Sequence, residues 1–191
     1  MSAVTDRVRR ALDVAVSGTL LLAAAPVLGV LALAVRATSP GPAFFRQERV
    51  GREGRPFRLL KLRTMVADAA ARGGVLTAPG DARVTRLGAV LRRWKLDELP
   101  QLLNVLRGDM SLVGPRPEQV ELVARYSPEH RVRLAVKAGL TGPMQVFGRG
   151  ELTFEERLAV EREYVETISL RRDLRIMTMT LSAIVSRRGA S

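Results

Sequence analysis

A long uncharged run near the N-terminus constrains the fold of this chain most. Residues 14–35 are 22 consecutive residues without a charged side chain. As an α-helix they would extend about 33 Å, close to the thickness of the hydrocarbon core of a bilayer. Their apolar side chains are not confined to one stripe, as they would be in a helix on the surface of a soluble core. The run therefore predicts a helix that enters a membrane.

A proline and the flanking charges favour a bent form of this helix. Pro26 lies at the centre of the run, where it removes a backbone donor and kinks the helix. Arginines flank the run on both sides, and positive residues tend to stay on the cytoplasmic face. A re-entrant helix that bends at Pro26 and returns to the same face satisfies both observations. The alternatives are a straight span, a secretory signal with small residues at 23–25, and a core helix of a soluble domain.

Composition points to an anionic partner and excludes several kinds of site. The 191 residues suffice for one domain, and the net charge is +12. All but three of the 31 basic residues are Arg, a forked donor suited to phosphate, although high genomic GC content would also enrich Arg. The partner would be nucleic acid, lipid headgroups or a phosphorylated substrate. With no Cys and one His, disulfides, thiolate metal sites and multi-His metal sites are excluded.

The middle of the chain predicts a β-hairpin. Residues 43–62 carry apolar side chains on both arms, and residues 51–54 supply a glycine-flanked turn. Lys61 and Arg63 lie at the end of the second arm. They are candidates for phosphate binding, and the alternative is a solvated basic strand end.

The remaining segments are mostly helical. Residues 84–95 repeat apolar side chains at helical spacing with basic residues on the other side, which predicts an amphipathic helix. Such a helix would lie on an anionic membrane surface or pack on a protein core. Residues 153–187 predict two further helices, the second either interfacial or in the core. The fold class is therefore α+β and mostly helical, with amphipathic helices around the site.

Two adjacent carboxylates, Asp97 and Glu98, are the candidate catalytic and metal-binding residues. Since Pro100 is tolerated only in the first turn of a helix, a helix is predicted to begin near Asp97 and to run toward Arg107. Asp97 would then be the N-cap and stay ionised in the field of the helix start. An ionised Asp can attack phosphorus, and Glu98 could hold Mg²⁺ together with substrate phosphates. The alternative is that both residues only stabilise the helix start.

Two segments downstream could contact phosphate. Arg116 lies between Pro115 and Pro117, so a stiff turn limits where its side chain points. Residues 137–143 predict a glycine-rich loop that leads to Arg149. Neither a Walker A pattern nor a Gly-x-Gly-x-x-Gly is present, so P-loop and Rossmann folds lack support.

Taken in order, these motifs resemble a known family. The matching segments are the apolar helix with Pro26, GPAFFRQERVGREGRPFRLLKLRTM, LDELPQLLNVLRGDMSLVGPRP, KAGLTGPMQVFGRG and the stretch 164–176. Together they resemble the bacterial sugar transferases of the monotopic phosphoglycosyl transferase superfamily, and they cover nearly the whole chain. Larger relatives add membrane helices before this region, so the chain would correspond to the minimal catalytic form.

The resemblance implies a reaction and roles for named residues. A phosphosugar would pass from a UDP-sugar to a polyprenyl phosphate, releasing UMP, as the first membrane step of surface-glycan assembly. In this sequence the nucleophile would be Asp97, and Glu98 would help to bind Mg²⁺. Arg116 would be associated with the nucleotide and Arg149 with phosphate, while Lys61 matches a basic position of the family.

The resemblance also implies an organisation and a location. Residues 1–40 would form the membrane-inserted helix, and residues 41–191 one catalytic unit at the cytoplasmic face of the bacterial inner membrane. The partners would be the donor, the acceptor and membrane lipids, with a homodimer left open. Nucleic acid is disfavoured because aromatic residues are only 4% of the chain. The main rival is a non-catalytic basic protein that binds anionic membranes.

Three positions depart from the family pattern. Ala25 stands where Ser often precedes the helix-breaking Pro, Ala138 replaces Pro in Lys-Pro-Gly, and Met144 replaces a frequent Trp. The kink loses one hydroxyl, the loop at Ala138 is expected to be looser, and Met144 is expected to alter sugar or lipid contacts.

Overall fold

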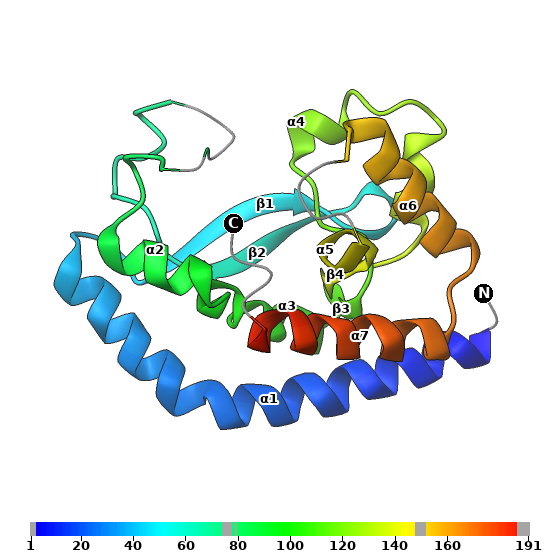
Figure 1. Cartoon of the computed structure of the whole chain (residues 1–191), viewed down its shortest axis with the longest axis horizontal. Helices are drawn as coiled ribbons and strands as arrows, with labels where there is room; N and C mark the ends of the chain where they lie inside the picture. Colours follow the sequence, from blue (N-terminus) through cyan, green and yellow to red (C-terminus); the bar gives the residue numbers. More distant parts are fainter. Residues whose placement is uncertain (1–2, 74–77, 79, 148–151, 187–191) are drawn as a thin grey trace.

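A computed structural model describes residues 3–73, 78, 80–147 and 152–186. Shorter helices lie between the long N-terminal helix and two small sheets, and the chain has the predicted mostly helical α+β fold (Figure 1). The helices are α1 Ala3–Thr38, α2 Arg86–Arg93, α3 Gln101–Arg107, α4 Val120–Val123, α5 Pro143–Phe147, α6 Phe154–Glu166 and α7 Leu170–Val185, with 3₁₀ turns η1 Arg52–Gly54, η2 Leu96–Glu98 and η3 His130–Ala135. The strands are β1 Phe44–Val50, β2 Pro56–Leu62, β3 Met110–Val113 and β4 Ala138–Thr141.

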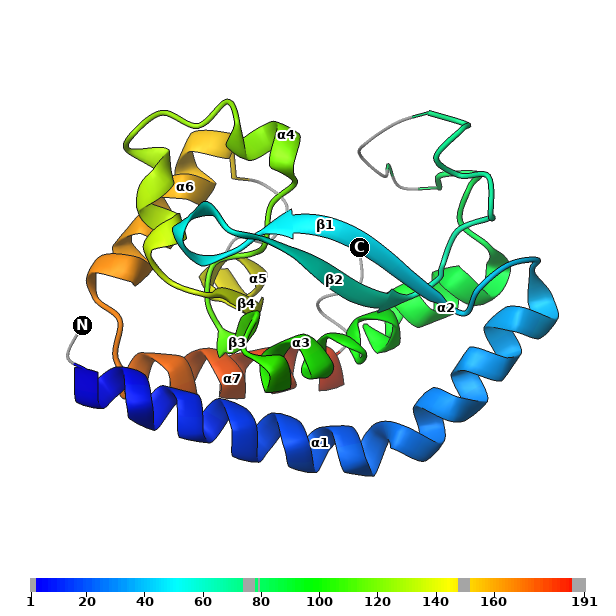
Figure 2. The same ribbon diagram turned by 180° about the vertical axis from the view of Figure 1, so that it is seen from behind.

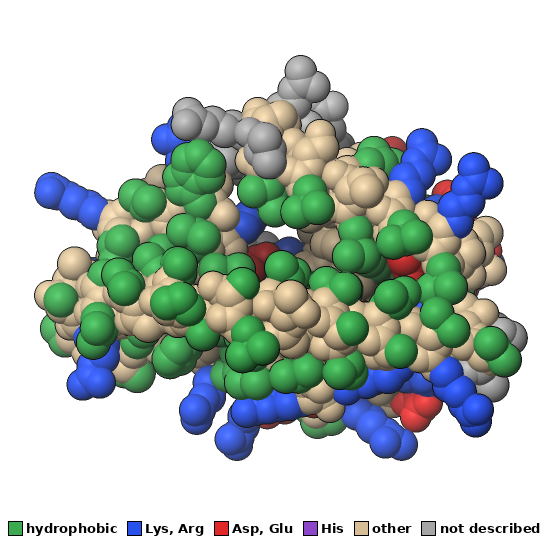
Figure 3. Space-filling model, turned by 90° about the horizontal axis from the view of Figure 1, so that it is seen from below, with side chains coloured by type: hydrophobic (Ala, Val, Ile, Leu, Met, Phe, Trp, Pro, Cys, Tyr) green, Lys and Arg blue, Asp and Glu red, His purple; other side chains and the backbone are tan. Residues whose placement is uncertain are grey.

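Helix α1 is a bent helix that underlies the rest of the molecule. It is continuous through Pro26 and curves along its length (Figures 1 and 2). Only 11% of its most apolar window is buried, and Leu22 and Leu33 are 79% and 70% exposed. Figure 3 shows apolar side chains across this face, with Lys and Arg along its margins. This exposure argues against a core helix of a soluble domain. Re-entry into a membrane stays a prediction.

The N-terminal part of α1 is attached to the body by buried polar contacts. The carboxylate of Asp13 accepts hydrogen bonds from Ser111 Oγ at 3.1 Å and from the backbone N–H of Leu112 at 2.9 Å. One turn earlier, Arg9 Nε lies 2.7 Å from Asp173 Oδ2 on α7. These contacts fix α1 against β3 and α7, which runs beside it in both views (Figures 1 and 2).

The other end of α1 is held by a buried arginine. Arg63 donates from Nη1 to the carbonyl of Pro40 at 2.6 Å and from Nη2 to the carbonyl of Ser39 at 2.7 Å. Arg63 Nη2 also lies 3.4 Å from the carbonyl oxygen of Val35 in the last turn of α1, where carbonyls lack backbone N–H partners within the helix. Both ends of α1 are thus bound to the same body.

The hairpin forms as predicted, whereas a predicted loop is a strand. Strands β1 and β2 pair antiparallel, with Phe44 opposite Leu62. The prediction of a loop at 137–143 is wrong, because β4 pairs there in parallel with β3. Gly139 permits this close pairing, since a Cβ on it would lie 2.1 Å from the backbone nitrogen of Gly114. The absence of a side chain at Gly139 therefore allows the two backbone segments to approach closely.

The core lies between the hairpin, α3, β3 and the last two helices. Val105, Met110, Tyr164 and Ile176 have no exposed surface there. Helix α7 buries Ile176 but leaves Leu181 63% exposed. The sequence left open whether this helix is interfacial or in the core. One face of α7 lies in the core and the other is exposed. Helix α2 is similar, with one apolar face packed against the body and another exposed.

Candidate active site

The Asp-Glu pair lies in a separate 3₁₀ turn. Turn η2 contains both carboxylates, and α3 begins only at Gln101 after Pro100 as its N-cap. The prediction that Asp97 caps this helix is therefore wrong. A 3₁₀ turn precedes α3, and Lys95 enters it in the left-handed region with φ 56°. The backbone N–H of Glu98 donates to the carbonyl of Lys95 at 3.2 Å.

Asp97 is a buried carboxylate with an unsatisfied oxygen. It is 5% exposed, and its Oδ1 has no hydrogen-bond partner within the described part of the chain. Burial raises the pKa of Asp97, and the charge of Glu98 raises it further, although Lys61 acts in the opposite direction. The sequence predicts a helix start that would keep Asp97 ionised, but its surroundings in the fold raise its pKa instead. A buried polar atom without a partner is rare and marks a candidate functional group.

Glu98 is held between two cations from distant parts of the chain. Its Oε1 lies 2.9 Å from Lys61 Nζ and 3.6 Å from Arg116 Nη2. Burial opposes ionisation, but the attraction of Lys61 and Arg116 outweighs it and lowers the pKa of Glu98 to about 2. The fold therefore brings together Lys61, Asp97, Glu98 and Arg116, four of the residues selected from sequence.

Three of these residues, Lys61, Glu98 and Arg116, line a pocket in which two further polar side chains lie. Its lining residues are Arg49, Leu59, Lys61, Glu98, Gln101, Arg116, Pro117, Gly139 and Leu140. Arg49 and Gln101 were not predicted from sequence. Arg49 donates to the carbonyl of Pro117 at 3.1 Å. Burial and the nearby charge of Arg116 lower the pKa of Arg49, and acidic neighbours partly oppose this. Strand alternation could have identified Arg49 as a site residue, since the hairpin register places Arg49 and Lys61 on the same face of the sheet.

The other predicted site residues lie elsewhere. The Arg63 side chain is used at the end of α1 and does not line the pocket. Pro115 is buried behind the turn that carries Arg116, where it lines a second, smaller pocket. Arg149 lies outside the described residues.

The carboxylates are compatible with a magnesium ion that the substrate helps to bind. Among the described residues no group of three or more His, Cys, Asp or Glu side chains could hold a metal. Mg²⁺ in phosphate-transferring sites commonly uses one or two carboxylates plus substrate phosphates. Asp97 and Glu98 supply two adjacent carboxylates, and the unpaired Oδ1 of Asp97 is an available ligand atom. The donor set therefore suits an ion that is bound with the substrate.

Comparison with known proteins gives consistent matches along the chain. The model of a family described as bacterial sugar transferase matches residues 4–187. A UDP-glucose:undecaprenyl-phosphate glucose-1-phosphate transferase of Caulobacter vibrioides is 46% identical over 189 residues, covering 95% of this chain and 71% of that protein. An Escherichia coli protein of the same name is 39% identical, covering 95% and 41%. A UDP-N-acetylgalactosamine-undecaprenyl-phosphate N-acetylgalactosaminephosphotransferase of Aeromonas hydrophila is 36% identical, covering 96% and 45%.

Proposed function

Since the chain belongs to the bacterial sugar transferase family, we propose that it moves a phosphosugar from a UDP-sugar to a polyprenyl phosphate. The products would be UMP and a polyprenyl-diphospho-sugar, the first membrane-bound intermediate of a surface glycan. The chain is an enzyme of the polyprenyl-phosphate phosphoglycosyl transferase class. The observation that carries the proposal is the buried carboxylate of Asp97, whose Oδ1 has no hydrogen-bond partner among the described residues, beside the cluster of Lys61, Glu98 and Arg116.

The proposed chemistry proceeds in two displacements at one phosphorus atom. A carboxylate oxygen of Asp97 attacks the β-phosphorus of the donor, the bond to the bridging oxygen breaks, and UMP leaves with that electron pair. An oxygen of the polyprenyl phosphate then attacks the same phosphorus, and the bond to Asp97 breaks. The free carboxylate is regenerated, so the enzyme returns to its starting state.

The surrounding charges would stabilise the groups that react. Lys61 and Arg116 converge on Glu98, and a diphosphate in the pocket would meet both cations. Because the Arg116 side chain is 48% exposed, its guanidinium is also accessible to a ligand from outside. Mg²⁺ bound by Asp97 and Glu98 with the substrate would neutralise the diphosphate and assist the departure of UMP.

We propose that α1 is a re-entrant membrane helix and that the site lies at the cytoplasmic face of the inner membrane. The apolar side chains of α1 face outward, and both of its ends are bound to one body through Arg9 and Arg63. A straight span would carry one end away from that body. A hollow beside the α1 face, in which acidic and basic side chains are visible, would admit an acceptor from the membrane (Figure 3).

The reaction is tested with purified protein in nanodiscs. Polyprenyl phosphate, Mg²⁺ and a panel of UDP-sugars are added, and the nucleotide and lipid products are analysed. We expect UMP together with a lipid that carries two phosphates, and loss of both in excess chelator. Release of UDP with a lipid that carries one phosphate would instead show glycosyl transfer and overturn the proposal. Turnover in excess chelator would show that the reaction does not require Mg²⁺.

A prediction about pH follows from the charges near Asp97. Its raised pKa means that the reactive ionised form is lost as pH falls through that pKa, which gives an acid limb in kcat/KM. Lys61 favours the ionised form, so Lys61→Met should raise the pKa of Asp97 and move the acid limb to higher pH. Arg93→Met, at an exposed position of α2, should leave the limb in place. An unmoved limb in Lys61→Met would contradict this assignment.

A further inference from the structure

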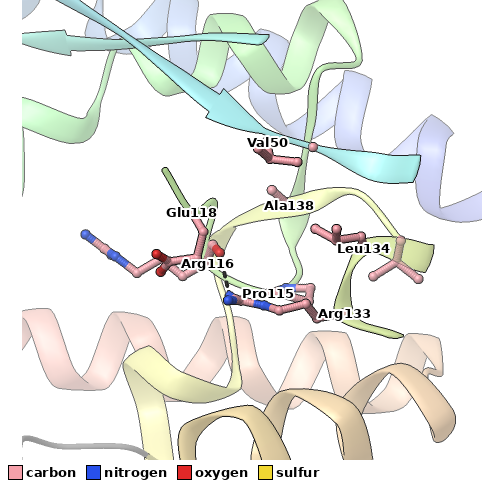
Figure 4. Close-up of a pocket in the computed structure, with 9 residues that line it drawn as sticks. Val50, Pro115, Arg116, Glu118, Arg133, Leu134 and Ala138 are labelled. Carbon is pink, nitrogen blue, oxygen red and sulfur yellow. Dashed lines mark hydrogen bonds between the residues drawn. The ribbon is translucent and has the colours of Figure 1, made fainter. Parts of the chain in front are cut away.

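A buried ion pair lies behind the turn that carries Arg116. Arg133 from η3 and Glu161 from α6 approach to 2.5 Å, and their side chains are only 6% and 3% exposed. Figure 4 shows Arg133 beneath this turn, with Arg116 projecting to the other side. Neither Arg133 nor Glu161 lines the pocket that contains Glu98.

Each member of the pair binds the backbone of Arg116 itself. Arg133 Nη2 donates to the carbonyl of Arg116 at 2.7 Å (Figure 4). The backbone N–H of Arg116 donates to Glu161 Oε1 at 3.0 Å. The backbone N–H and the backbone carbonyl of Arg116 are therefore both bound by the same ion pair. The prolines on either side lack N–H groups, so Arg116 has the one backbone N–H among these three residues. The carbonyls of Pro115 and Pro117 accept hydrogen bonds from Gly139 and Arg49, but the backbone of Arg116 itself is bound by the ion pair.

The guanidinium of Arg133 is held on several sides. Besides Glu161 and the Arg116 carbonyl, its Nη1 donates to the hydroxyl of Tyr126, and its Cζ lies 5.6 Å from the centre of the Tyr126 ring. A buried ion pair commonly stabilises a fold no better than apolar residues of the same size. Stability alone is therefore a weak reason for this arrangement, whereas orientation of the turn accounts for the two hydrogen bonds to the Arg116 backbone.

We propose that Arg133 and Glu161 are positioning residues that orient Arg116 toward the nucleoside diphosphate of the donor, an inference that rests on the proposed function. The guanidinium of Arg116 reaches within 3.6 Å of Glu98, so a small rotation of the turn would carry it away from the pocket. Displacement of a binding group by about 1 Å is enough to reduce turnover substantially. The acceptor lacks a nucleotide, so its binding should not depend on this pair.

The test uses a double variant that keeps the volume of the pair but removes its charges. Arg133→Met with Glu161→Leu leaves no unpaired buried charge, and it should fold with an unfolding temperature near that of the parent. We expect the KM for the UDP-sugar to rise about tenfold or more, with the KM for polyprenyl phosphate unchanged. Arg133→Met with Glu161→Gln, which retains an oxygen for the Arg116 N–H and leaves no unpaired buried charge, should recover part of the donor affinity. Arg162→Gln with Glu166→Gln, an exposed pair on the same helix, is the matched control.

Coupling to Arg116 separates positioning from a general structural role. If the pair acts through Arg116, the double variant should weaken donor binding little further in an Arg116→Ala background. Additive effects in that background, an unchanged donor KM, or equal losses for donor and acceptor would each overturn the inference. UDP affinity, measured by titration calorimetry, gives a readout without turnover. A parent protein that binds UDP but forms no UMP would contradict the proposed reaction, and the UDP affinities would still decide the positioning role.

Discussion

Asp97→Asn is expected to abolish phosphosugar transfer while leaving the fold intact. An amide cannot displace UMP, and loss of a covalent nucleophile reduces turnover on the order of 10³-fold or more in other enzymes. The side chain keeps its size, so packing around η2 should not change. Because burial raises the pKa of Asp97 and its Oδ1 has no partner in the described residues, the ionised group disfavours the folded state. The amide should therefore unfold at the same temperature as the parent or at a higher one.

Loss of transfer without loss of stability would distinguish a chemical role of Asp97 from a structural one. UMP release and thermal unfolding are measured on the same nanodisc preparations. Asp68→Asn is the control, because Asp68 is an exposed carboxylate whose ion-pair partner among the described residues is Arg72, four residues later. It should change neither quantity appreciably. Full turnover by Asp97→Asn would exclude the aspartyl intermediate, whereas a large fall in unfolding temperature would assign Asp97 to the fold.

Local signals in the sequence predicted the long helix, the hairpin and four residues that the fold brings together. The uncharged run predicted α1, alternation and a glycine-flanked turn predicted the hairpin, and the doublet Asp97-Glu98 was selected as an adjacent pair. Lys61 and Arg116 were each selected from a local feature, a basic strand end and a proline-bounded turn. That both of them contact Glu98 could not be predicted, because it depends on how β2 and the turn after β3 pack around η2.

Two of the differences from the sequence predictions come from contacts between distant segments, and a third is local. The glycines at 137–143 read as a loop because nothing local reveals that β3 lies beside them. Arg63 looked like a phosphate ligand because only the fold shows the carbonyls of Ser39 and Pro40 in its reach. Asp97 was read as a cap because its own 3₁₀ turn, entered through the left-handed Lys95, has no sequence signature.

The second large effect expected is on stability, from Asp173→Asn in the contact between α1 and α7. Asp173 Oδ2 accepts from Arg9 Nε at 2.7 Å, and its Oδ1 accepts from the Tyr164 hydroxyl at 2.7 Å. Arg9 also donates to Tyr164 Oη at 3.1 Å and to the Val113 carbonyl at 3.0 Å. The Arg9 and Asp173 side chains are 10% and 11% exposed. An asparagine keeps the shape of the group but deprives the Arg9 guanidinium of this carboxylate.

Breaking one partner of a buried ion pair typically costs about 3 to 5 kcal/mol, whereas exposed pairs contribute less than about 1 kcal/mol. Asp173→Asn should therefore lower the unfolding temperature clearly and expose the N-terminal part of α1 to protease before the rest of the chain. Glu166→Gln, which removes an exposed partner of Arg162 on α6, is the control and should change neither. The double variant Arg9→Met with Asp173→Leu removes both charges at once and should recover much of the stability. If Asp173→Asn behaves like Glu166→Gln, then α1 is held mainly by Asp13 and by Arg63 at its far end, and the Arg9 contact is dispensable.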